Sequence, residues 1–248
     1  MTSPMPAPSA PVPAPPPAPP FVPGAVLRSP VGLGRATAAL LGLAIATDLF
    51  ACVADVQEMN VLGDFVDGVR GEGIVHRAQQ ADTLNNAAGH AQAWTLIATA
   101  VVYLCWLWRV RVNSEAFDQS AHSMRRGWVI GGWFCPVVNL WFPRRVVLDT
   151  WDASVPWGAR TGHGWVNAWW TLWIVGLLTG YIANVSMEAA HHSARLLRNA
   201  VEQMLFSDAV DVAAGVLAIV VVVRLTRMQH RKALAGQALA QAPAPAFG

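Results

Sequence analysis

Residues 128–142, WVIGGWFCPVVNLWF, decide the topology of the rest of the chain. Arginine pairs stand on both sides of this stretch, Arg125-Arg126 before it and Arg144-Arg145 after it. As a straight helix its 15 residues would reach only about 22 Å, whereas the hydrocarbon core of a bilayer is about 30 Å thick. The Gly131-Gly132 pair and Pro136 also disfavour a straight helix. We therefore expect a re-entrant or interfacial segment that does not cross a membrane.

The composition indicates a membrane protein. Of 248 residues, 54% are hydrophobic and 13% are charged, against about a quarter charged in soluble domains. The net charge of +2 argues against a nucleic-acid partner, which requires a concentrated basic surface. Cys52, Cys105 and Cys135 all lie in apolar blocks, so we interpret them as small buried hydrophobic residues and expect neither a disulfide framework nor a metal site.

Four apolar blocks are candidates for membrane-spanning helices. They cover about residues 36–53, 91–108, 165–186 and 209–223, within an all-α membrane domain of residues 31–227. Small residues allow helices to approach closely in lipid, so we expect Gly42 in the first block, and Gly176 and Gly180 in the third, at helix contacts.

The segments between and around these blocks are polar or rich in proline. Residues 1–30 consist largely of proline and alanine, which predicts a disordered cytoplasmic tail that either docks a protein partner or serves as a spacer. Residues 55–90 are polar, and four glycines predict a loop in their first half. Residues 187–206 are typical of a separate amphipathic helix, after which Ser207 would cap the last span. Residues 228–248 form a short cytoplasmic tail.

The distribution of basic residues predicts the orientation. If residues 128–142 do not cross, four spans place both termini on one side of the membrane. The other side then holds only four of the 17 basic residues, Arg70, Arg77, Arg195 and Arg198, and thirteen remain with the termini. This bias predicts a multi-pass protein of the bacterial plasma membrane with both termini in the cytoplasm.

The Trp-rich segment and its arginines are candidates for contact with lipid. Tryptophan favours the headgroup level, and arginine favours the anionic lipid of the inner leaflet. The residues that we expect at this contact with the bilayer and with anionic phospholipid are Arg125, Arg126, Trp128, Trp133, Trp141, Arg144 and Arg145.

A second set of polar residues maps to the outer ends of the spans. Its members are Asp48, His90, Tyr181, Asn184, His191, His192 and Asp211. Acids and histidines that converge at this level could bind a cation or relay protons, although polar residues at helix ends are also ordinary in membrane proteins. Asp48 lies within an apolar block, and His191 or His192 is its expected partner.

Several motifs of the central region resemble those of a bacterial family named domain of unknown function 4328. The resemblance covers roughly residues 36–226 and rests on Trp106, Arg109, Asn113, Trp128, Trp133, Pro136, Asn139, Pro143, Trp151, Trp169 and Trp170. It implies a polytopic membrane protein and supplies no activity.

The sequence contains no catalytic, nucleotide-binding or metal-binding motif that points to a reaction. We expect a non-catalytic membrane protein without a cofactor that organises partners or lipids and is able to form a homo-oligomer. The alternative is a small transporter or channel-like protein that uses the outer polar residues.

Overall fold

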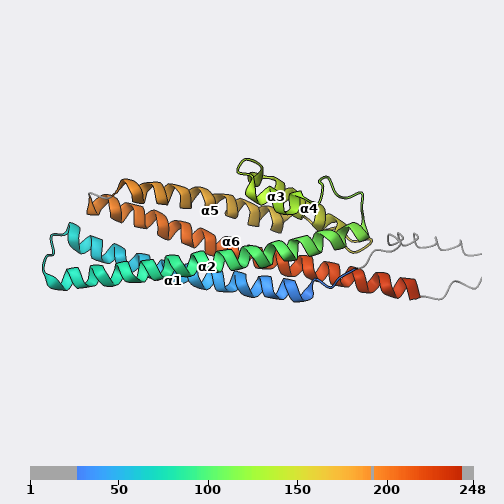
Figure 1. Ribbon diagram of the computed structural model, residues 1–248, viewed down its shortest axis with the longest axis horizontal. Coiled ribbons are helices and arrows are strands. Elements are labelled where there is room, and N and C mark those ends of the chain that lie inside the picture. Colours follow the sequence, from blue (N-terminus) through green and yellow to red (C-terminus); the bar gives the residue numbers. More distant parts are fainter. Residues whose placement is uncertain (1–26, 191–192, 242–248) are drawn as a thin grey trace, which may run out of the picture.

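The computed structural model describes residues 27–190 and 193–241, and in these ranges it contains helices and no strand. The four long helices are α1 (Val31–Val66), α2 (Glu72–Phe117), α5 (Gly164–Ala189) and α6 (Ala194–Gln241). They lie side by side along the long axis of the molecule (Figure 1). Of the tail predicted to be disordered, residues 1–30, the first 26 lie outside the described residues. Arg28 is held by hydrogen bonds between its backbone and the Asn113 side chain.

The four long helices are each long and apolar enough to cross a membrane. This confirms the predicted class, an all-helical protein with four candidate spans. α1 and α6 contain 36 and 48 residues, which correspond to about 54 and 72 Å of helix. Both exceed the roughly 30 Å of a hydrocarbon core, so a helix of this length that crossed a bilayer would extend beyond the core.

The predicted loop in the first half of residues 55–90 is wrong, because α1 and α2 continue through almost all of this polar stretch. Only residues 67–71 connect them, and Gly68 and Gly71 adopt φ values of +87° and +124° that favour glycine in the turn. Val61 packs against Ile74 and Ala81 across the hairpin. Apolar residues at helical spacing therefore hold together the polar ends of these two helices.

The predicted boundary at Ser207 is also wrong. Ser207 lies inside α6, is buried, and accepts a hydrogen bond from the Thr179 hydroxyl at 3.2 Å. No proline occurs between residues 194 and 241, so nothing in the backbone chemistry interrupts the helix. α6 consequently unites the expected amphipathic helix, the last span and much of the expected tail.

Residues 128–142 fold as short pieces. α3 (Trp128–Phe134) and the 3₁₀ helix η1 (Val138–Leu140) lead into α4 (Phe142–Ser154). α4 packs against α2, α5 and α6, so this region lies beside one half of the bundle (Figure 1).

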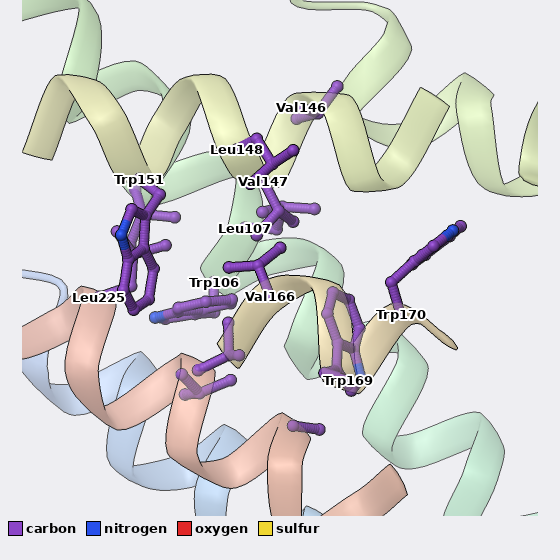
Figure 2. Close-up of a cluster of buried hydrophobic side chains, with 14 of the residues drawn as sticks. Trp106, Leu107, Val146, Val147, Leu148, Trp151, Val166, Trp169, Trp170 and Leu225 are labelled. Atoms are coloured by element: carbon purple, nitrogen blue, oxygen red, sulfur yellow. The ribbon is translucent and has the colours of Figure 1, made fainter. Parts of the chain in front are cut away.

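The main hydrophobic core lies where these short helices meet the bundle. Figure 2 shows Trp106 of α2, Trp151 of α4, Val166 of α5 and Leu225 of α6 converging there. The Trp106 indole also donates a hydrogen bond to the Thr226 hydroxyl at 3.0 Å. Large aromatic side chains of α2, α4 and α5, together with aliphatic side chains of α6, thus fix the position of α4 relative to the bundle.

A polar network continues this core beyond the apolar part of α6. The Gln229 amide donates to the Val110 carbonyl oxygen at 2.6 Å and to the Ser154 hydroxyl at 3.0 Å, and its oxygen accepts from Asn113 at 3.3 Å. Buried Lys232 donates to the Ala153 carbonyl oxygen at 2.8 Å. Burial lowers the pKa of this lysine. The network joins α2, α4 and α6 through hydrogen bonds that water cannot easily replace.

The predicted glycine contacts hold for two of three positions. A Cβ on Gly176 would collide with the Asp211 carboxylate, and one on Gly180 would lie 3.3 Å from the Ser207 hydroxyl oxygen. Gly42 is different, because a Cβ there would meet no other atom within 4 Å. The helix contact predicted for Gly42 is therefore not formed within the described residues.

Candidate functional site

Four aspartates of α1 and α6 gather inside the bundle. Asp48 and Asp55 lie seven residues apart on α1, and Asp208 and Asp211 lie three apart on α6, so each pair occupies one face of its helix. α1 packs directly against α6, and the carboxyl groups lie within electrostatic range of one another. The packing therefore concentrates negative charge between two helices.

Gln92 of α2 links the two aspartate-bearing helices. Its side-chain nitrogen donates to Asp48 Oδ1 at 3.1 Å and to Asp208 Oδ1 at 3.2 Å. Seven residues before Gln92 on α2, the Asn85 side-chain nitrogen donates in the same manner to the Glu58 carboxylate of α1. α2 thus supplies neutral donors to the acids of α1 and α6, and neither amide can neutralise them.

The Asp55 and Asp208 carboxyl groups lie within hydrogen-bonding reach of each other. Asp55 is buried, and its Oδ2 has no hydrogen-bond partner among the described residues. Within the same residues, none of the four aspartates forms an ion pair with a basic side chain. Burying acidic groups without a positive partner is costly, so this arrangement marks a candidate site.

A cavity of about 490 Å³ adjoins the aspartates. All four long helices contribute to its lining, which includes Asp48, Gln92 and Asp211. Gly176 lies beside Asp211, and the absence of a side chain there leaves room for the carboxylate. The polar groups consequently have an open volume next to them, bounded on its other sides by apolar residues.

Not all residues of the predicted outer polar cluster join this site. Asp48 and Asp211 do, and Tyr181 lines the cavity although its side chain is 72% exposed. His90 is exposed on the surface of α2, and the exposed Asn184 donates to the Gly180 carbonyl oxygen of its own helix at 2.8 Å. These two do not belong to the site, because their positions on the helix turn them outward. His191 and His192, including their expected pairing with Asp48, lie outside the described residues.

Three residues of the site were not predicted from the sequence: Asp55, Gln92 and Asp208. Asp55 was assigned to a loop and Asp208 to a helix start, so neither was placed on the inner face of a continuous helix. The seven-residue spacings of Asp48 to Asp55 and of Asn85 to Gln92 are the signal that could have revealed them. Such spacing is meaningful only once the helices are known to extend past the apolar blocks.

The three tryptophans of the predicted lipid contact differ in their surroundings. Trp128 and Trp141 are exposed, as are the nearby apolar side chains Phe134 and Val137. Trp133 instead makes edge-to-face contacts with aromatic rings of α2 and α5, among them Tyr103, Trp170 and Trp173. Trp133 is therefore a packing residue of the aromatic cluster.

The predicted lipid-binding arginines are mostly engaged within the chain. Three have polar partners in the described residues: Arg126 pairs with Glu115, Arg144 with Asn167 and Arg145 with Asp149. Desolvation alone would raise the pKa of Glu115, but the hydrogen bond and charge of Arg126, together with Arg111, lower it overall. Of the four predicted arginines, only Arg125 has no such partner in the described residues. Sequence alone could not separate arginines that face lipid from arginines that hold a loop.

One of three comparisons with known proteins gives a match for this chain. Comparison with curated proteins and with solved structures found no match to this chain. A family model described as "Domain of unknown function (DUF4328)" matches residues 75–227, from the start of α2 to the arginine-rich part of α6. This range is more than half of the 248 residues and includes the Trp-rich block on which the resemblance rests. The chain is therefore a member of the DUF4328 family and a helical protein with four candidate membrane spans.

Proposed function

We propose that this protein is a small channel- or transporter-like membrane protein that binds protons at the aspartates of α1 and α6. The observation that carries the proposal is the pair of adjacent carboxyl groups of Asp55 and Asp208, linked through Gln92 to Asp48. The proposal develops the alternative drawn from the sequence, and it keeps the expectation that the protein is not an enzyme.

Hydrogen-bond chemistry favours a proton shared between the Asp55 and Asp208 carboxyl groups. An ionised carboxylate only accepts hydrogen bonds, so two adjacent carboxylates repel, whereas a single shared proton turns one of them into a donor. That proton would also give a partner to Asp55 Oδ2, which lacks one in the described chain. Gln92 donates to Asp208 and Asp48, and thus forms a polar connection from this pair toward the cavity.

The site is placed to exchange protons with water at one end and with the cavity at the other. Glu58 and Asn85 lie on the side of the hairpin turn, and Asp211 lies on the side of the apolar part of α6. At the far end of the cavity lining, the Thr99 hydroxyl donates to the Leu40 carbonyl oxygen at 3.4 Å. Acidic and hydroxyl groups that follow one another in space in this way are the usual components of proton relays in membranes.

We expect Asp208→Asn to abolish proton binding and flux, because the amide cannot exchange a proton. Infrared spectra of the purified wild-type chain at neutral pH should contain the C=O stretch of a protonated carboxyl group, and the variant should lack it. In liposomes with a trapped pH-sensitive dye and an imposed membrane potential, wild type should acidify or alkalinise the lumen. The matched control is Asp67→Asn, which removes an exposed acid of the turn.

Two results would contradict the proposal. Flux of wild type equal to that of empty liposomes would exclude the channel- or transporter-like function. Asp208→Asn with unchanged spectra and unchanged flux would exclude the aspartate pair as the site. Melting curves of the purified variants separate loss of the site from loss of the fold.

The orientation forms part of the proposal. We place both termini in the cytoplasm of a bacterial cell, because thirteen of the 17 basic residues then lie on the inner side. Residues 128–142 would lie at the inner interface, where the exposed side chains of Trp128, Phe134 and Trp141 reach lipid. The aspartates would then face the outside.

Single-cysteine labelling tests this orientation. In a chain whose three native cysteines are replaced by serine, a membrane-impermeant reagent added to intact cells should modify cysteine at position 67. It should modify cysteine at position 119 or 159 only after the membrane is opened. All three positions are exposed, so accessibility differs between them only through the membrane. Labelling of position 159 from outside would require residues 128–142 to cross the bilayer.

A further inference from the structure

A second cavity, of about 630 Å³, lies between α6 and the loop that connects α4 to α5. Its lining combines three arginines of α6 with two tryptophans and residues of the loop: Trp151, Pro156, Thr161, Gly162, Gly164, Trp165, Arg224, Arg227, Met228 and Arg231. No acidic side chain belongs to the described lining. The cavity therefore presents concentrated positive charge without compensation.

The three arginines lie on one face of α6. Their spacing of three and four residues places Arg224, Arg227 and Arg231 in a row over two helical turns. Within the described residues, neither Arg227 nor Arg231 has an ion pair or a side-chain hydrogen bond. This distinguishes them from the arginines around residues 128–142, three of which are already engaged.

Contacts around the cavity hold its walls in place. The Arg224 guanidinium lies over the Trp165 ring, 4.4 Å from its centroid. The Trp151 indole donates to the Thr161 hydroxyl at 3.0 Å and so fixes the loop. Asp152 of α4 forms a hydrogen bond with the His163 ring at 2.7 Å. The cavity is a formed site, since its loop, its aromatic wall and one arginine are held before any ligand binds.

The cavity lies at the edge of the apolar region. Trp165 begins the expected third span and Arg224 directly follows the expected last span, so both stand at headgroup level. Guanidinium groups bind phosphate through paired, charge-assisted hydrogen bonds.

We propose that this cavity binds a phosphate group, held by Arg227 and Arg231 with Arg224 positioned by Trp165. The ligand is either the headgroup of an anionic phospholipid or a soluble phosphate-bearing molecule, and the chemistry of recognition is the same for both. The site is about 24 Å along α6 from Asp211 and is independent of the proposed proton site.

The experiment uses the full chain purified in a mild detergent and studied by native mass spectrometry. The probes are dihexanoyl phosphatidic acid, dihexanoyl glycerol, which lacks the phosphate, and inorganic phosphate. Wild type should bind one phosphatidic acid in preference to the glycerol. Arg227→Gln with Arg231→Gln should weaken that binding by about tenfold or more, because each arginine contributes charge at the membrane surface.

The matched control is Arg35→Gln with Arg109→Gln, which removes the same charge from arginines that do not line the cavity. Its affinity for phosphatidic acid should remain within about twofold of wild type, because the residues lie outside the site. If the glutamine variant fails to fold, Arg227→Lys with Arg231→Lys replaces it. Lysine keeps the charge but lacks the paired donors, so binding should still be weaker than in wild type.

Competition identifies the source of the phosphate. Displacement of phosphatidic acid by millimolar inorganic phosphate supports a soluble ligand, and resistance to displacement supports a lipid headgroup. Equal binding of phosphatidic acid and dihexanoyl glycerol would overturn the proposal. An equal loss of affinity in the cavity variant and the control would overturn it as well, because binding would then follow net charge alone.

Discussion

Replacing Gln229 with leucine is expected to destabilise the protein by about 3 kcal/mol or more, the largest effect among the substitutions considered. Gln229 is 1% exposed and bonds Val110, Ser154 and Asn113 at once. Leucine fills a similar volume but removes one hydrogen bond from each of these buried partners. Each buried group that loses its partner costs about 1–3 kcal/mol.

The unfolding of purified protein in detergent, followed by the loss of a monodisperse peak on heating, measures this effect. Gln237→Leu is the matched control, because it makes the same chemical change at an exposed position of the same helix. It should leave the melting temperature unchanged. If the two variants melt together, the network around Gln229 does not stabilise the fold.

Replacing Gly176 with alanine is expected to have the second-largest effect. The new Cβ would collide with the Asp211 carboxylate, and both α5 and α6 pack closely there. Overpacking of this kind costs about 1–3 kcal/mol, and displacement of a buried acid adds to it. Gly176→Leu should be worse, because the longer side chain has to displace α6 itself.

Gly42→Ala is the control for this prediction. A Cβ at position 42 meets nothing within 4 Å, and alanine is favoured over glycine in a helix by up to about 1 kcal/mol. The melting temperature should therefore stay constant or rise slightly. A Gly42→Ala variant as unstable as Gly176→Ala would show that position 42 contacts a second copy of the chain.

The sequence predicted those features of the fold that depend on hydrophobicity alone. Four apolar blocks gave four candidate spans, and the glycines and proline of residues 128–142 correctly excluded one continuous helix there. The ends of the helices could not be predicted, because residues 55–66 and 72–77 are too polar to identify as helices by composition. Their stability comes from contacts such as Val61 with Ile74, which exist only after the hairpin has formed.

The candidate site was predicted in part for the same reason. Asp48 and Asp211 are conspicuous because they interrupt apolar blocks. Gln92 lies at the very start of an apolar block and Asp55 in the polar stretch that follows another, and at such block ends an amide or an acid is ordinary. Only the packing of α1 against α6 and α2 turns them inward, and side-chain direction relative to a neighbouring helix is not encoded by any local pattern.

Because α6 is one continuous helix, movements at its two ends are coupled. One uninterrupted ladder of backbone hydrogen bonds runs from Asp208 to Arg231, with no proline between them. Twisting one end against the other would break these hydrogen bonds, so the helix rotates as one rigid body. A rotation of α6 that moves Asp208 away from α1 must therefore rotate Arg227 and Arg231 through the same angle. These arginines would then move relative to the loop between α4 and α5.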